Sequence, residues 1–240
     1  MNALLIRVGA DQTAGGCNGL VDSQTLEFVY IPIPESCDTH DHLAKPYSLF
    51  GEAIQQFGES LPSHLTGRNT HLDPDFEYLT YGDQGGRAVQ ITSYLEPGDL
   101  VAFYAGLRDI RPNERLVYAI IGLYVIEEII DARLIPENRW HENAHTRRRL
   151  AAGDIIIRAK RGISGRLERC LPIGSYRPPA GDPGKRPSYR VSSDLLNIWG
   201  GFNVRDGFIQ RSARLPQFLN ADLFYQWFQK QGVSLIERNN

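Results

Sequence analysis

Two runs of β-branched and aromatic residues constrain the fold of this chain more than any other feature. The first covers residues 100–104 and follows the turn sequence Pro97-Gly98-Asp99, and the second covers residues 117–126. Such side chains favour the pleated, half-buried setting of a strand, and Pro, Gly and Asp at a boundary are typical of turns. We therefore expect two neighbouring strands in the core of a sheet.

Other segments add strands and one helix. Residues 3–8 and 28–33 are apolar and flank a Gly-rich turn, with two prolines at the end of the second, so we expect a hairpin-like pair. Residues 154–159 predict another strand, and residues 220–232 have helical spacing between an Asn N-cap and a Gly stop. Together these patterns predict an α+β fold: a strand-rich mixed sheet with a C-terminal helix.

Composition favours one globular domain over residues 1–240. The chain is 42% hydrophobic and 22% charged, and such a chain buries a full core. Residues 177–187 are the only Pro/Gly-dense stretch and predict an exposed loop. No run of eighteen apolar residues occurs, and Arg7 interrupts the first apolar segment. With three widely spaced cysteines, these features predict a cytoplasmic protein that does not enter membranes.

Charge is distributed unevenly along the chain. Residues 1–99 carry 4 basic and 14 acidic side chains, whereas residues 133–169 carry 10 basic and 4 acidic ones. Arginines make up 22 of the 26 basic residues, and their guanidinium groups bind phosphate in a fork and stack on bases. This favours an anionic partner, although pairing with the acidic half would use the same charges. The candidate phosphate ligands are Arg7, Arg147, Arg148, Arg166, Arg169 and Arg211.

The sharpest local motif is His141-Glu142-Asn143-Ala144-His145, which has the form H-E-x-x-H. On a helix, histidines four residues apart share a face and can bind Zn²⁺, with the glutamate as general base. The charged flanks disfavour that interpretation, because a zinc-protease helix is packed among apolar residues. We favour His141 and His145 as proton-transfer groups beside a phosphate site, and an exposed polar segment is the plainest alternative.

Two more acidic positions and one histidine are candidates for the same chemistry. His71 and Asp73 lie in a segment kept extended by Pro74 and could complete a metal site with His141 and His145, or orient one of these imidazoles. Asp11 lies in the Gly-rich turn after residues 3–8 and is a candidate acid, base or metal ligand. A turn cap is the commoner role of such aspartates. Tyr104 and Trp199 are candidate surfaces for base stacking, although each also suits a core position.

Several of these motifs together resemble the nucleotide modification associated domain, the third family of that name. The resemblance runs over nearly the whole chain and is carried by residues 7–11, Gly15-Gly16, 30–35, 71–76, 142–148 and 164–166. It implies an association with systems that alter or act on nucleobases in DNA. It implies no particular reaction.

A shorter stretch is similar to PUA-like domains such as the EVE and ASCH groups. Residues 97–108 and 118–130 match their pattern of Gly-Asp, apolar residues, Phe-Tyr and then a Gly-containing apolar strand. This similarity implies a PUA-like β-barrel element, and those small barrels hold a flipped base.

We therefore expect a protein that engages nucleic acid, DNA foremost, or a nucleotide, and that acts on a single base drawn out of the stack. A non-enzymatic reader of modified bases is the second hypothesis, and a zinc-dependent hydrolase using His141 and His145 is the third. Otherwise the sequence indicates no metal, and it identifies neither a cofactor nor an oligomeric state. The expectation depends on the imidazoles, the turn with Asp11 and the arginines lining one concave surface.

Overall fold

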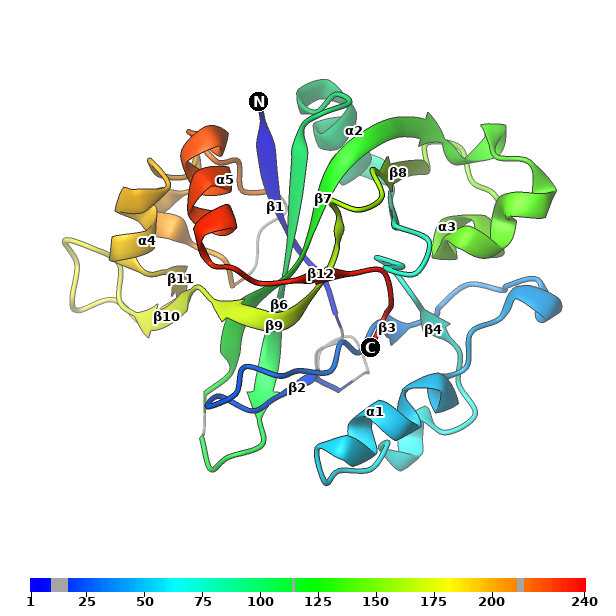
Figure 1. Cartoon of the computed structure of the whole chain (residues 1–240), viewed down its shortest axis with the longest axis horizontal. Helices are drawn as coiled ribbons and strands as arrows, with labels where there is room; N and C mark the ends of the chain where they lie inside the picture. The colour runs from blue at the N-terminus through cyan, green and yellow to red at the C-terminus, as the bar shows by residue number, and fades with distance from the viewer. Residues whose placement is uncertain (10–16, 114, 211–213) are drawn as a thin grey trace.

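The centre of the molecule is a mixed sheet built around two long strands, β6 (Leu100–Asp109) and β7 (Val117–Asp131) (Figure 1). The computed structural model describes residues 1–9, 17–113, 115–210 and 214–240. β6 and β7 pair in antiparallel fashion, and β1 (Ala3–Arg7) runs parallel to β6. Nearly every residue of β6 is buried, as expected of a strand covered on both faces. The sequence prediction of two neighbouring core strands is confirmed.

The other edge of β7 carries two strands in succession. Its first half pairs with β9 (Gly165–Pro172), and its second half pairs with β8 (Ile155–Ala159), which in turn pairs with β5 (Thr80–Asp83). β12 (Leu235–Ile236) adds to β9, and the short β2 (Leu20–Val21) runs parallel to the end of β6. The path β1-β6-β7-β8-β5 is open at both ends. The PUA-like stretch thus forms the β6–β7 hairpin, and the described strands do not close into a barrel.

In the described ranges, two small sheets and five α-helices flank this centre. β3 (Ile33–Pro34) pairs with β4 (Thr70–His71), and β10 (Gly174–Arg177) pairs with β11 (Ser188–Val191). Figure 1 shows β3, β4 and α3 on one side of the central strands and α4 and α5 on the other. The α-helices are α1 (Gly51–Gln56), α2 (Gly85–Tyr94), α3 (Ala144–Arg147), α4 (Ser193–Ile198) and α5 (Ala221–Lys230). Short 3-10 helices cover Asp41–Leu43, Tyr47–Phe50, Ser63–Leu65, Ala132–Leu134, Glu137–Glu142 and Arg205–Gly207.

The predicted C-terminal helix is present as α5. The side chain of Asn220 accepts a hydrogen bond from Leu223 N (3.1 Å), so the expected N-cap is formed. Trp199, at the end of α4, is fully buried against α5, in edge contact with Phe224 and Trp227. A ring with no exposed face has no surface on which a base can stack.

The predicted N-terminal hairpin is wrong. β1 pairs with β6, and residues 28–33 do not form a strand beside it. Val29 N donates to Leu20 O and Tyr30 N donates to the side chain of Asn240, so this segment obtains its hydrogen bonds elsewhere. Pro32 and Pro34 have no N–H to give to a ladder. Residues 3–8 and 28–33 are therefore not paired with each other.

Within the part of the chain that the structure describes, no helix has the length and apolar character needed to cross a lipid bilayer.

The β10–β11 hairpin and the loop of residues 178–187 that joins its strands depend on Asp206. Its carboxylate accepts two hydrogen bonds from Arg177 (2.7 and 2.8 Å) and one from Ala180 N (2.8 Å), and Arg190 lies 3.5 Å away. The hydrogen bonds from Arg177 and the nearby positive charge of Arg190 hold the pKa of Asp206 below its ordinary value.

We expect Asp206→Asn to lower the free energy of unfolding at pH 7 by about 1–3 kcal/mol, because hydrogen bonds to a charged group are lost. A carboxylate with a depressed folded-state pKa stabilises the protein above its unfolded pKa, and the stabilisation disappears as pH falls through the folded pKa. Urea unfolding of both proteins between pH 3 and 7 should show the difference shrinking below about pH 4. A constant difference across this range would contradict the assignment.

Candidate functional site

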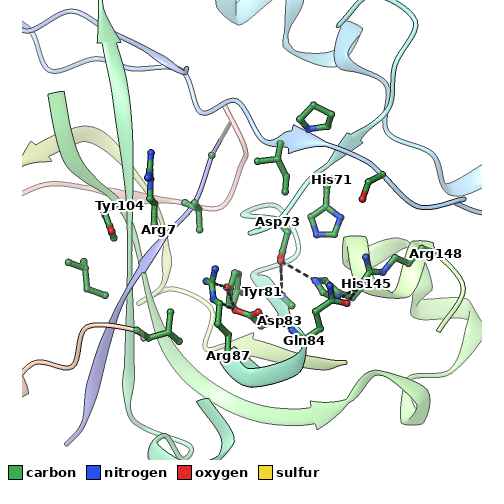
Figure 2. A pocket seen from close by; sticks show the side chains of 18 of the residues that line it. Arg7, His71, Asp73, Tyr81, Asp83, Gln84, Arg87, Tyr104, His145 and Arg148 are labelled. Atoms are coloured by element: carbon green, nitrogen blue, oxygen red, sulfur yellow. Dashed lines mark hydrogen bonds and ion pairs between the residues drawn. The ribbon is translucent and has the colours of Figure 1, made fainter. Parts of the chain in front are cut away.

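A pocket of about 480 Å³ beside β1 and β5 is lined largely by polar and charged side chains. This volume lies within the range of small-molecule sites in proteins, roughly 300–1,000 Å³. Its charged and polar lining residues are Arg7, Ser36, His71, Asp73, Tyr81, Asp83, Gln84, Arg87, Tyr104, His145 and Arg148. Figure 2 shows Arg7 and Tyr104 toward one end and His71, His145 and Arg148 toward the other.

Backbone pairing brings the imidazole end together from four distant segments. His71 lies opposite Ile33 in the β3–β4 pair, and Asp73 follows two residues later. Antiparallel pairing of β5 with β8 sets Asp83 opposite Ile155, the residue after Asp154. His145 lies on α3, whose cap residue Asn143 accepts from His145 N (2.8 Å) and donates to Asp73 Oδ1 (3.0 Å).

Gly82 on β5 is required for the close approach of α3. A Cβ at this position would lie 2.4 Å from Cδ2 of His145 and 2.7 Å from Oδ1 of Asn143. The backbone N–H of Gly82 also donates to both oxygens of Asp73 (2.9 and 3.1 Å). Only glycine lets the imidazole pack directly on the strand while the strand holds the carboxylate.

His145 is oriented by a buried acid. Its Nδ1 lies 3.0 Å from Oδ2 of Asp154, and Arg148 Nη2 donates to the same oxygen (2.9 Å). Burial raises the pKa of Asp154, but the hydrogen bonds from His145 and Arg148 outweigh it and hold this pKa below its ordinary value. Arg148 Nη2 also lies 2.9 Å from His145 Nδ1. Because an ionised Asp154 can only accept, we take its Oδ2 as the shared acceptor of the Arg148 N–H and of a proton on Nδ1. Nε2 of His145 then carries the lone pair.

His71 is held in the same way. Its Nδ1 lies 2.7 Å from Oε2 of Glu35, whose side chain is only 4% exposed. Burial raises the pKa of Glu35, while the contact with His71 and two backbone N–H groups bring it below the ordinary value. The rings of His71 and His145 meet edge to face, with centroids 5.1 Å apart.

Asp73 lies beside the two rings (Figure 2). Its side chain is 5% exposed, and its Oδ2 is 3.8 Å from Nε2 of His145. Burial raises the pKa of Asp73, although the neighbouring imidazoles and the hydrogen bonds from Gly82 and Asn143 act in the opposite direction. Within the described ranges, His71, Asp73 and His145 are the one group of His, Cys, Asp and Glu residues whose ligand atoms are close enough to hold a metal ion.

The other end of the pocket is basic and aromatic. Arg7 Nη1 donates to Gln210 O (2.5 Å), and its guanidinium lies 5.5 Å from the centroid of the Tyr118 ring. Arg87 donates to the hydroxyl of Tyr81 (2.8 Å) and pairs with Asp83. Tyr104 lines the pocket, but its hydroxyl donates to Ile209 O and the residue is only 3% exposed. The pocket thus offers guanidinium groups at one end and imidazoles with a carboxylate at the other.

The two histidines of the H-E-x-x-H motif do not share a helix face. His141 belongs to the 3-10 helix Glu137–Glu142, and Asn143 adopts an extended conformation before α3 begins. The His141 ring contacts Tyr78, and Glu142 pairs with Arg139 and Arg158. The predicted His141–His145 metal pair is therefore wrong, because the backbone changes direction between its two members.

The arginine candidates divide into three groups. Arg148 and Arg7 line the pocket, and Arg169 is exposed on β9, outside the pocket. Arg147 is buried in an ion pair with Asp75, and Arg166 is buried over the ring of Phe28. Burial lowers the pKa of Arg166 to about 10. Because Arg147 and Arg166 are buried, the prediction that they bind phosphate at a surface is contradicted. Asp11 and Arg211 lie outside the described residues.

Sequence reasoning missed the residues that support the site. Asp83, Gln84, Arg87 and Asp154 gave no motif, and Glu35 entered only through the family resemblance, because each reaches the site through tertiary contacts. One signal was available: Asp154 directly precedes an apolar strand only nine residues after His145. An acidic residue at such a position is close enough along the chain to accept a hydrogen bond from the preceding imidazole.

A comparison with known protein families gives a match. The model of a family described as "Nucleotide modification associated domain 3" matches residues 2–194 of the 240. This range contains every pocket-lining residue except Leu215 and Pro216. No curated protein and no solved structure matches the chain.

Proposed function

The chain belongs to the nucleotide modification associated domain 3 family, and from this premise we propose that its pocket binds a nucleotide and acts on the base. The observation that carries the proposal is the pairing of an oriented imidazole, His145, with a basic end in one cavity. The family supports association with nucleotide modification. The base and the reaction belong to the proposal.

The polarity of the pocket gives the ligand a direction. A phosphate binds at the basic end, where Arg7 and Arg87 present guanidinium groups. The base then extends toward His71, Asp73 and His145. A pocket of about 480 Å³ matches a ligand of nucleotide size, since small-molecule sites span roughly 300–1,000 Å³.

His145 is the proposed proton-transfer group. With Nδ1–H donated to Asp154, its Nε2 accepts a proton from the ligand, and the buried carboxylate stabilises the imidazolium that results. Arg148 contacts the same carboxylate oxygen and Gln84, so it fixes the position of Asp154. This support behind the imidazole favours an enzyme over a reader, because recognition alone needs no acid behind a histidine.

The test measures binding of deoxynucleoside and ribonucleoside monophosphates, with the matching nucleosides, by isothermal titration calorimetry. Arg7→Ala should weaken monophosphate binding about 10–100-fold, the effect of losing one charged hydrogen bond of 1.5–3 kcal/mol. Nucleoside binding should change little. Arg169→Ala is the matched control, because Arg169 is an exposed arginine on β9, outside the pocket. Equal losses in the two variants, or no binding by the wild type, would refute the proposal.

A second measurement separates a free nucleotide from a polymer. The logarithm of the binding constant falls against the logarithm of salt concentration with a slope of about −0.7 per phosphate contact on a single strand. A short single-stranded DNA bound only through the pocket should therefore show the same shallow slope as the monophosphate. Analysis of nucleosides by mass spectrometry after incubation then distinguishes turnover from reading, since a reader binds and leaves the base unchanged.

A further inference from the structure

We propose that His71, Asp73 and His145 bind a divalent transition-metal ion, with two imidazole nitrogens and one carboxylate oxygen as ligands. The ligand atoms of the three residues lie within 4.8 Å of one another. Ligands 2.1 Å from a tetrahedral ion are about 3.4 Å apart, so modest side-chain rotations close the site. His145 Nε2 and Asp73 Oδ2, at 3.8 Å, are already near that separation.

Each ligand has a partner that orients it. Glu35 engages Nδ1 of His71 and Asp154 engages Nδ1 of His145, which leaves Nε2 of both rings for an ion. Metal-binding histidines almost always donate their other nitrogen to a carboxylate, carbonyl or water. Asp73 Oδ1 is held by Gly82 N and Asn143 Nδ2.

The buried carboxylates around the cluster favour a cation. Three carboxylates surround the cluster, from Glu35, Asp73 and Asp154, and each side chain is no more than 5% exposed. Arg148 is the cation in contact with them, through Asp154. Buried carboxylates are costly unless they are paired or coordinate a metal, so an ion beside Asp73 would add to the counter-charge that Arg148 supplies.

The donor set indicates the class of ion. Imidazole nitrogens suit zinc and iron, and two histidines with one carboxylate form the three-ligand face that leaves positions open in non-haem iron sites. Calcium and magnesium prefer sites made of oxygen alone. The cluster lines the wall of the pocket, so the open positions face the cavity, where water or a ligand completes the coordination.

The experiment uses the full chain, freed of metal by chelation, and titrates Co²⁺ as a spectroscopic probe and Zn²⁺ by calorimetry. The wild type should bind one equivalent and give visible Co²⁺ absorption. His71→Ala, His145→Ala and Asp73→Asn should each lower the affinity about a hundredfold and change the spectrum. Asp73→Asn keeps the hydrogen-bonding shape of the side chain, so circular dichroism should show it folded even where a histidine variant is not.

His141→Ala and His64→Ala are the matched controls, because each removes one imidazole outside the cluster. Both should bind the metal like the wild type. Glu35→Gln tests whether Glu35 positions the His71 ring. The affinity for Co²⁺ should fall about 10–100-fold, with an altered Co²⁺ spectrum and unchanged stoichiometry. Binding of less than 0.2 equivalents by the wild type, or loss of binding in His141→Ala but not in His71→Ala, would overturn the proposal.

Nε2 of His145 has one lone pair, so in the ion-bound protein it is a metal ligand and not the proton acceptor. Ion binding and nucleotide binding are measured separately, so either proposal can fail alone. The metal titrations contain no nucleotide. The nucleotide titrations are repeated with and without Zn²⁺ on the same protein. If the protein binds the metal but no nucleotide, the metal site is supported and the proposed function is refuted. If it binds the nucleotide but no metal, only the metal site is refuted.

Discussion

Arg147→Ala should lower the free energy of unfolding by about 3–5 kcal/mol, the usual cost of removing one partner from a buried ion pair. Arg147 pairs with Asp75, and the two side chains are 3% and 0% exposed. The guanidinium also donates to His141 O (2.7 Å), so it ties α3 to the 3-10 helix before it. The alanine variant leaves Asp75 buried with no cation in contact. Urea unfolding followed by circular dichroism measures the loss.

Two comparisons make this result specific. Arg149→Ala removes an exposed arginine two residues away, and surface changes of this kind usually stay within about 0.5 kcal/mol. The double variant Asp75→Asn/Arg147→Met should be more stable than Arg147→Ala alone, because it removes the buried charge with its partner. If Arg147 instead served a phosphate, its alanine variant would keep full stability and lose ligand affinity.

Gly82→Ala should disable the pocket without unfolding the chain. The new methyl group would lie 2.4 Å from Cδ2 of His145 and 2.7 Å from Oδ1 of Asn143, and real Cβ atoms do not approach so closely. Overpacking of this kind costs about 1–3 kcal/mol. Since α3 must move away, His145 loses its place beside Asp73 and Asp154. We expect Co²⁺ affinity to fall about 10–100-fold, as when the orientation of a ligand is lost.

Gly86→Ala is the matched control for this variant. Gly86 lies in the first turn of α2, four residues from Gly82, and a Cβ there meets nothing within 4 Å. Alanine is a better helix former than glycine, so the stability of Gly86→Ala should equal or slightly exceed that of the wild type. The ring signals of His145 in NMR spectra should shift in Gly82→Ala and stay in place in Gly86→Ala. Unchanged signals in both variants would show that the strand tolerates the methyl group.

Local patterns were sufficient for elements whose stability depends on their own residues. Residues 100–104 and 117–126 contain enough β-branched and aromatic side chains to predict β6 and β7, and the Asn cap with its apolar spacing predicts α5. Residues 28–33 have a similar composition, yet no strand forms at Val29–Pro32 because its partners are Leu20 and Asn240. Strand propensity therefore predicts that a segment is buried and extended. Whether it pairs as a strand depends on which sheet edge is free to accept it.

The candidate site, too, was predictable in part from local sequence and in part only from the fold. His71, Asp73 and His145 could be selected from the sequence because imidazole and carboxylate groups are rare and chemically specific. The H-E-x-x-H interpretation assumed one helix across His141 and His145, and the extended Asn143 breaks that helix. Arg147 and Arg148 are adjacent in the chain, but one is buried against Asp75 and the other faces the pocket.

Short sequence segments were enough to predict the central strands, the C-terminal helix, the family and the chemical types in the site, since these depend on composition and residue order. Only the folded chain shows that Glu35 and Asp154 contact His71 and His145 from behind, that Arg147 supports the fold and that Gly82 leaves space for α3. Those contacts join residues brought together by the β3–β4 and β5–β8 pairs and by the packing of α3. Their geometry depends on register and packing across the whole core, which no local window contains.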